Sequence, residues 1–290
     1  MQRGLALGVP ALGVVLGAGL VHEVHKVAHA PLPHFEDNDP SGVYGDPLGA
    51  TVQVTVLGDS SVTAPGLASG RLSWIALACD SMDSRIELRS LAKGGSRVAD
   101  VLTAQLPALL EDPPEVAVLA IGSNDVMHAT PTRVFRRRLG EVLDALSSVC
   151  AVVTVGVGDL SVIPRLTPAL RGLAARRSAT IDRIHAQECD RRTDVVRVDV
   201  RRSADPFFAS AGPGLFTADA FHPNEVGHHI WAGCFTEPLR CAIEASSEVV
   251  IDLTDGSTPR CARMLPGRTL SDRCCEGSAR PARRCAAPTP

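Results

Sequence analysis

The sequence predicts an α/β protein, a three-layer αβα sandwich built around a five-stranded parallel sheet. Two observations predict this fold. Short apolar runs rich in β-branched residues alternate with stretches of helical spacing over residues 51–250, and this alternation is typical of βαβ units with right-handed crossovers. In addition, residues 116–121 are continuously apolar, as strands of a parallel sheet are when both of their faces are buried.

The elements follow one another in a regular order. The expected strands are residues 52–57, 86–92, 116–121, 151–157 and 195–200. The expected helices are residues 67–79, 97–110, 132–149, 166–190 and 224–245. In open parallel sheets the binding crevice lies at the carboxyl ends of the strands, so candidate functional residues are expected there.

The first 50 residues divide into an apolar segment and a linker. Arg3 precedes an uncharged run over residues 4–21, which approaches the roughly 20 apolar residues that cross a bilayer. The run also fits a cleaved secretory signal, and a buried helix of the folded domain is a third interpretation. Anchor and signal both place the domain outside the cytoplasmic membrane. Residues 22–50, rich in His, Pro, Asp and Gly, are typical of a linker.

Composition narrows the range of partners and cofactors. The net charge of −3 and the aromatic content of 3% disfavour nucleic-acid binding, which needs cationic surfaces and rings for stacking. The nine cysteines fit an oxidising compartment, but their pairing is left open. They show no repeated Cys-x-x-Cys pattern of the kind that holds zinc. Residues 251–290 are rich in Arg, Pro and Cys and are expected to form an irregular tail.

Two motifs supply the parts of a nucleophilic site. The Gly58-Asp59-Ser60 motif places Ser60 directly after the first strand, where it would project into the crevice. A serine hydroxyl is a weak nucleophile that needs a base, and the base needs an orienting group. Asp219 and His222 are three residues apart just before the last helix and can supply both. Helix capping or an ordinary polar loop is the alternative interpretation of each motif.

Acyl transfer also needs hydrogen-bond donors aimed at the developing oxyanion. Asn124 follows the third strand within Ile121-Gly-Ser-Asn-Asp125 and can donate its side-chain amide. The Lys93-Gly-Gly-Ser96 stretch follows the second strand, where a glycine lets a backbone N–H approach the substrate closely. The backbone N–H of Ser60 is the third candidate donor.

Taken together, these motifs resemble those of the SGNH (GDSL-type) hydrolases over about residues 51–245. The corresponding segments are Gly58-Asp59-Ser60, Gly95 with the run that follows it, Gly122-Ser123-Asn124-Asp125 and Asp219-Ala-Phe-His-Pro-Asn224. The resemblance implies a flavodoxin-like sheet, a Ser60–His222–Asp219 triad and an oxyanion hole made by Ser60, Gly95 and Asn124, without a metal or organic cofactor. Ala64 stands where the family often has glycine, which leaves the width of the acyl pocket open.

The expected activity is therefore that of a serine esterase working through an acyl-enzyme. The family also includes thioesterases and carbohydrate O-acetyl esterases, and the sequence does not choose among these substrates. A position near the membrane favours lipid or cell-envelope esters. A non-catalytic binding module on the same fold is one alternative. A nucleotide-binding doubly wound protein is another, although the Gly-x-Gly-x-x-Gly spacing is missing after the first strand. Oligomeric state is left open.

Overall fold

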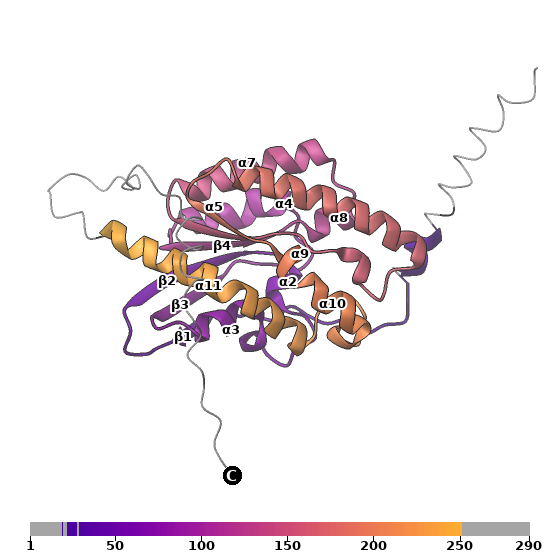
Figure 1. Ribbon diagram of the computed structural model, residues 1–290, viewed down its shortest axis with the longest axis horizontal. Helices are drawn as coiled ribbons and strands as arrows, with labels where there is room; N and C mark the ends of the chain where they lie inside the picture. Colours follow the sequence, from indigo (N-terminus) through magenta and orange to yellow (C-terminus); the bar gives the residue numbers. More distant parts are fainter. Residues whose placement is uncertain (1–18, 20–21, 28, 251–290) are drawn as a thin grey trace, which may run out of the picture.

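The computed structural model of the protein describes residues 19, 22–27 and 29–250 (Figure 1). The expected tail over residues 251–290, and all of the uncharged run over residues 4–21 except Gly19, lie outside the described residues. None of the helices within the described ranges has both the length and the apolar character that a bilayer-spanning segment requires.

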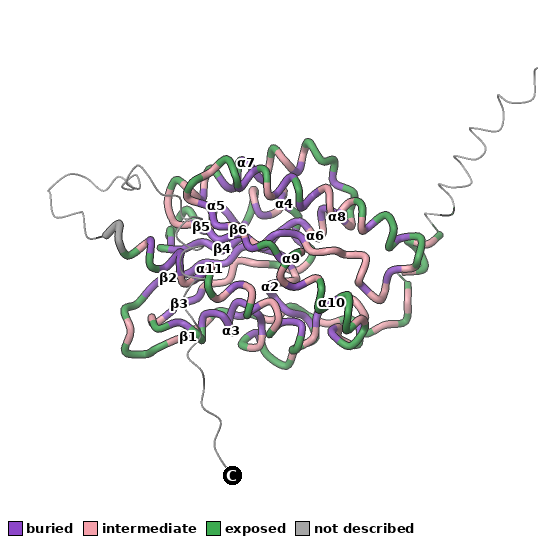
Figure 2. Tube along the Cα trace, in the orientation of Figure 1, coloured by how far each residue is buried: buried purple, intermediate pink, exposed green. Residues whose placement is uncertain are grey.

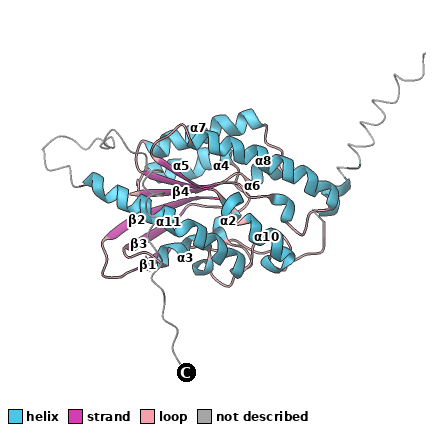
Figure 3. Cartoon of the chain, viewed as in Figure 1, coloured by secondary structure: helices cyan, strands magenta, loops and turns pink. Residues whose placement is uncertain are grey.

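A six-stranded sheet in the order β1-β3-β2-β4-β5-β6 forms the centre of the molecule (Figure 3). The strands are β1 (Gly42–Gly45), β2 (Thr51–Gly58), β3 (Arg85–Ser90), β4 (Val116–Ala120), β5 (Ala151–Val155) and β6 (Val195–Val198). Strands β2 to β6 pair in parallel, so the α/β fold and its parallel sheet are confirmed.

The expected strand count of five was wrong, because β1 adds an edge strand antiparallel to β3. Its four residues lie in the segment that was expected to be a linker. Tyr44 explains why they belong to the domain: its ring is buried and its hydroxyl donates to the carbonyl of Pro40 at 2.7 Å. A four-residue strand is too short for an alternating pattern to be visible in the sequence.

Helices cover both faces of the sheet (Figure 1). The α-helices are α2 (Ser60–Thr63), α3 (Trp74–Asp80), α4 (Val98–Asp100), α5 (Leu106–Leu110), α6 (Ser123–Met127), α7 (Thr132–Ser147), α8 (Pro168–Cys189), α9 (Val200–Ser203), α10 (Asp205–Ala211) and α11 (Glu225–Val250). Short 3-10 turns are η1 (Gly70–Leu72), η3 (Leu160–Val162) and η4 (Gly212–Leu215), and a π turn, η2 (Val101–Gln105), joins α4 to α5. The expected helices over 67–79 and 97–110 are therefore interrupted, and α9 and α10 were not expected.

Two apolar clusters fill the space between sheet and helices, and the buried stretches of the chain run through the strands at the centre of Figure 2. On one face Val56 packs in a cluster with side chains of α3 and α11, among them Phe235. On the other face its neighbour Leu57 packs with side chains of α7 and α8. Adjacent residues of β2 thus face opposite layers, as the period of a strand requires. Burying each such side chain contributes about 1.5–3 kcal/mol, so this packing stabilises the sheet that carries the site.

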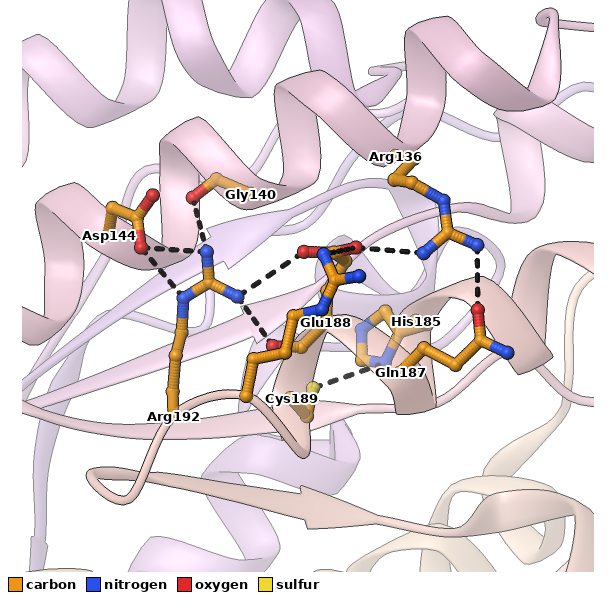
Figure 4. Close-up of polar contacts among 9 residues, drawn as sticks. Arg136, Gly140, Asp144, His185, Gln187, Glu188, Cys189 and Arg192 are labelled. Carbon is orange, nitrogen blue, oxygen red and sulfur yellow. Dashed lines mark hydrogen bonds and ion pairs between the residues drawn. The ribbon is translucent and has the colours of Figure 1, made fainter.

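An ion cluster around the buried Glu188 carboxylate joins α7 to α8 (Figure 4). The Glu188 carboxylate is only 4% exposed and pairs with Arg136 and Arg191 at 2.9 Å and with Arg192 at 3.5 Å. Beneath it, the wholly buried His185 contacts the Thr154 hydroxyl at 2.9 Å. That hydroxyl donates to the carbonyl of Leu119, so His185 Nε2 must be the donor in their contact. Burial lowers the pKa of His185 to about 3 and keeps the imidazole neutral.

Candidate active site

Ser60 stands at the point where β2 passes into α2. Asp59 caps the helix, since its carboxylate accepts from the Ser61 N–H at 2.9 Å. A Cβ at Gly58 would lie 2.5 Å from the Ala120 carbonyl of β4, so only glycine lets the two strands run this close before the turn. In the described chain the Ser60 hydroxyl has no hydrogen-bond partner, which leaves it available to a substrate.

Asp219 holds His222 in a single orientation. One carboxylate oxygen lies 2.6 Å from His222 Nδ1. The other accepts from the Thr217 hydroxyl at 2.7 Å and from the N–H groups of Phe221 and His222 at 2.8 and 3.0 Å. Ala220 adopts a left-handed φ of 56°, which bends the turn back onto Asp219. Because an ionised carboxylate can only accept, Nδ1 carries the proton and Nε2 is the basic nitrogen.

Burial and hydrogen bonding shift the pKa values of two carboxyl groups in the site, Asp219 and Asp59. Burial opposes the ionisation of Asp219, but the hydrogen bonds from His222 and Thr217 outweigh it and hold the pKa of Asp219 well below its usual range. Asp59 is 1% exposed, and burial raises its pKa to about 6 against the opposing effect of its bonds to Ser61 and of the His222 charge. The carboxylate that orients the imidazole is therefore ionised throughout the neutral range.

Ser60, Asn124 and His222 line one cavity of about 120 Å³. Because the sheet order is β2-β4-β5-β6, the cavity crosses the carboxyl ends of adjacent strands, from Ser60 after β2 to Val198 in β6. Most of its wall is apolar, including Trp74, Ile121, Met127, Val157, Leu160, Val162, Ile163, Val200, Phe208, Phe216, Phe221, Trp231 and Phe235. Ser60 and His222 share this space, but no hydrogen bond joins their side chains in the described residues.

Of the candidate oxyanion donors Asn124 and Gly95, only Asn124 lines the cavity. Asn124 lines the cavity, and its amide nitrogen donates to the Ser96 carbonyl at 3.1 Å and to Asp59 at 3.3 Å. Gly95 has a φ of 79° in an exposed turn and is not among the residues that line the cavity. An oxyanion bound by the Asn124 amide must therefore replace one of its two present acceptors.

Gly122 sets the direction of the turn that carries Asn124. Its φ of 127° falls in the region that side chains disfavour, and a Cβ there would lie 2.7 Å from a methyl group of Val157. The third motif thus needs glycine both for its backbone conformation and for the space beside β5.

Sequence reasoning missed the residues that shape the cavity. Trp231 and Phe235 come from α11 and Phe208 from α10, and all three line it. Asp205 also lines it; its carboxylate accepts from the Asp159 N–H at 2.7 Å, and burial raises its pKa to about 6. The four-residue spacing of Trp231 and Phe235 indicated one helix face, but nothing in the sequence linked that face to Ser60.

Within the described ranges, no group of three or more His, Cys, Asp or Glu side chains is placed to hold an ion. The arrangement can instead supply an unpaired hydroxyl, a carboxylate-bound imidazole and an amide donor at one end of an apolar space.

An αβα sandwich with Gly-Asp-Ser after its first parallel strand and Asp-x-x-His before its last helix is the architecture of the SGNH class of ester-hydrolysing enzymes. Residues 56–230 match the model of the GDSL-like Lipase/Acylhydrolase family. The chain belongs to this family and is an ester-hydrolysing enzyme.

Known relatives agree with this assignment. A GDSL-like esterase of Mycobacterium tuberculosis, Rv1075c, is 29% identical over 225 residues, which cover 75% of this chain and 71% of the relative. The enzyme LAE5 from the metagenome of Lake Arreo shares the fold with a TM-score of 0.52 at 17% identity, covering 69% of this chain and 97% of LAE5. A catalytic mutant of Axe2, an acetylxylan esterase from Geobacillus stearothermophilus, gives 0.52 at 16% identity, covering 65% and 94%.

Proposed function

We propose that this enzyme is a serine esterase in which Ser60 is the nucleophile, His222 the general base and Asp219 the residue that orients it. The 2.6 Å contact between Asp219 and His222 Nδ1 carries the proposal, because it leaves Nε2 unprotonated beside the cavity that Ser60 also lines. A serine with such a partner can attack an ester carbonyl at neutral pH.

The reaction proceeds in two acyl-transfer steps. His222 takes the Ser60 proton as the hydroxyl attacks, and Asp219 stabilises the imidazolium that forms. His222 then protonates the leaving alcohol, and a water molecule activated by the same imidazole releases the acid. The hydrogen bond between Ser60 and His222 forms when substrate is bound, as such bonds often tighten only in the complex.

The oxyanion is held by the Ser60 N–H and by the amide of Asn124. Asn124 turns one N–H from the Ser96 carbonyl, now at 3.1 Å, or from Asp59, now at 3.3 Å, to the substrate oxygen, where the developing charge strengthens the bond. The Gly95 N–H makes no hydrogen bond in the described chain and serves as the third donor once the substrate covers the exposed turn.

The lining of the cavity supports esters with an apolar acyl group. Apolar side chains form most of the wall beyond Ser60, and each methylene of an acyl chain buried there contributes about 0.8 kcal/mol. Lipid or cell-envelope esters fit this lining, and residues 4–21, as a signal or an anchor, would bring the enzyme outside the cytoplasmic membrane. Thioesters offer the same acyl group, so a thioesterase activity is the second candidate.

A nucleophile assay tests the proposal. Ser60→Ala is expected to abolish both hydrolysis of p-nitrophenyl butyrate and labelling by a fluorophosphonate. The matched variant Ser61→Ala, which changes the adjacent hydroxyl, is expected to keep labelling. Undiminished labelling of Ser60→Ala would refute the assignment, and a correctly folded wild type that hydrolyses no ester or thioester would favour the non-catalytic binding module.

A further inference from the structure

The N-terminal segment lies directly against the loop that carries His222. Residues 22–27 are helical, and the Val27 side chain packs on a small apolar cluster that Phe221 also touches. The Arg165 guanidinium donates twice to the Val27 carbonyl, at 3.2 and 3.1 Å, and the Arg165 N–H donates to the carbonyl of Ala220 at 2.9 Å. The chain that follows the uncharged run over residues 4–21 therefore meets the domain beside the catalytic turn.

Several exposed apolar side chains lie on helices that border the cavity or the N-terminal segment. Seven large apolar side chains are exposed in the described part of the chain, and four of them lie on helices that line the cavity or pack on the apolar cluster beside it. These four, here called the apolar rim, are Val24 (52% exposed), Leu173 (43%), Phe207 (56%) and Val226 (58%). They belong to helix 22–27, the first turns of α8, α10 and the first turn of α11. Helix 22–27 and the start of α8 lie at the right of Figure 1, and α10 lies below them, nearer the centre.

Single exposed apolar side chains are ordinary on soluble proteins, but several of them beside one site indicate an apolar partner. The cavity beside this group is itself apolar, and it is lined by Phe208 of α10 and by Phe221, which packs on the same apolar cluster as Val27. Lys26, exposed on helix 22–27, adds a cationic group of the kind that meets lipid headgroups.

We propose that the apolar rim docks the opening of the active site onto a phospholipid bilayer, so that acyl chains reach Ser60 from the membrane. The proposal rests on the proposed esterase function and specifies where its substrate comes from. The uncharged run over residues 4–21 selects a bilayer as the occupant: inserted as an anchor, it would end immediately before helix 22–27 and bring the bilayer surface to the rim. Tethered in this way, the rim needs little additional affinity to dock, because the effective lipid concentration is already high.

Two pairs of substitutions in the full-length protein test docking. Phe207→Asp with Val226→Asp places charges on the rim, at positions in the first turns of α10 and α11 where a carboxylate favours the helix. Leu48→Asp with Leu110→Asp is the matched control, because these exposed side chains lie on a turn and on α5, away from the cavity lining. Residues 4–21 are present in both, so attachment to vesicles is the same and only docking differs.

The readout compares two substrates. Each protein is assayed with soluble p-nitrophenyl butyrate and with p-nitrophenyl palmitate in unilamellar vesicles of phosphatidylcholine and phosphatidylglycerol. Relative to wild type, the rim pair is expected to lose about tenfold or more in the ratio of vesicle to soluble rate, since each side chain buried in lipid is worth on the order of 1 kcal/mol or more. The control pair is expected to keep the ratio.

The outcomes separate the two proposals. An unchanged ratio in the rim pair, with soluble ester hydrolysed normally, would overturn docking and leave the esterase function intact. Equal losses on both substrates, or a change in oligomeric state measured by light scattering, would also overturn docking, because the rim would then serve the fold or a second copy of the chain. Failure of wild type on both substrates would instead remove the esterase function on which docking rests.

Discussion

Replacing Asp219 by Asn tests whether this carboxylate sets the protonation of the imidazole. One oxygen of Asp219 accepts three hydrogen bonds, from the Thr217 hydroxyl and two backbone N–H groups, at 2.7, 2.8 and 3.0 Å. An asparagine can keep all three hydrogen bonds only if its side-chain oxygen takes the position of this carboxylate oxygen. Its NH₂ group then faces His222 Nδ1. Two donors cannot face each other at the present 2.6 Å, so the imidazole must move its proton to Nε2.

Moving the proton to Nε2 should lower kcat, because Nε2 is the nitrogen that acts as the base. A protonated Nε2 cannot take the proton of Ser60, so kcat for p-nitrophenyl butyrate is expected to fall about 10⁴-fold, the loss typical of this exchange in a serine triad. That corresponds to about 5.5 kcal/mol of transition-state stabilisation. The fold should be little affected, because exchanging charge-assisted for neutral hydrogen bonds removes only about 1–2 kcal/mol.

Steady-state kinetics measure kcat, and urea unfolding measures the free energy of unfolding. Asp205→Asn is the matched control, because it makes the same chemical change in the same cavity, where the carboxylate accepts from the Asp159 N–H rather than from an imidazole. Its kcat should stay within a few fold of wild type. If Asp219→Asn remained folded and lost less than about tenfold in kcat, the tautomer argument would be wrong.

Three further predictions concern the turn at Gly122, the cavity wall at Val200 and the buried His185. Gly122→Ala, whose Cβ would lie 2.7 Å from Val157 at a φ of 127°, should lower the free energy of unfolding by about 2 kcal/mol or more, and a value near zero in urea titration would contradict the strain. Val200→Phe fills the far end of the cavity and should shift the butyrate-to-decanoate ratio of kcat/KM about tenfold or more toward butyrate, whereas an unchanged ratio would place the acyl chain elsewhere. Burial lowers the pKa of His185 to about 3, so the unfolded chain binds the extra proton, and the stability this residue contributes above pH ~6.5 is lost as the pH falls. The difference in unfolding free energy between wild type and His185→Gln should therefore shrink by about 2 kcal/mol from pH 7 to pH 5, and parallel pH curves would refute it.

The parallel core and the order of the motifs could be predicted from the sequence by itself. Residues 116–121 indicated a central strand because a segment buried on both faces must be apolar throughout, and β4 occupies Val116–Ala120. The Gly-Asp-Ser and Asp-x-x-His motifs were recognisable because each depends on contacts within a few residues, such as the hydrogen bond from Ser61 to Asp59 and the contact between Asp219 and His222.

Only the tertiary structure decided which surfaces meet. Strand β1 was not predicted, because four residues carry no period and its pairing partner lies on β3. The wall of the cavity combines Trp231 of α11, Phe208 of α10 and Val157 after β5, positions whose proximity comes from chain crossovers and not from local pattern. The hydrogen bonds from Arg165 to the Val27 carbonyl join residues that are 138 positions apart in the sequence. Local preferences determine elements and turns, whereas the shape of the site depends on long-range packing, which a single sequence does not specify position by position.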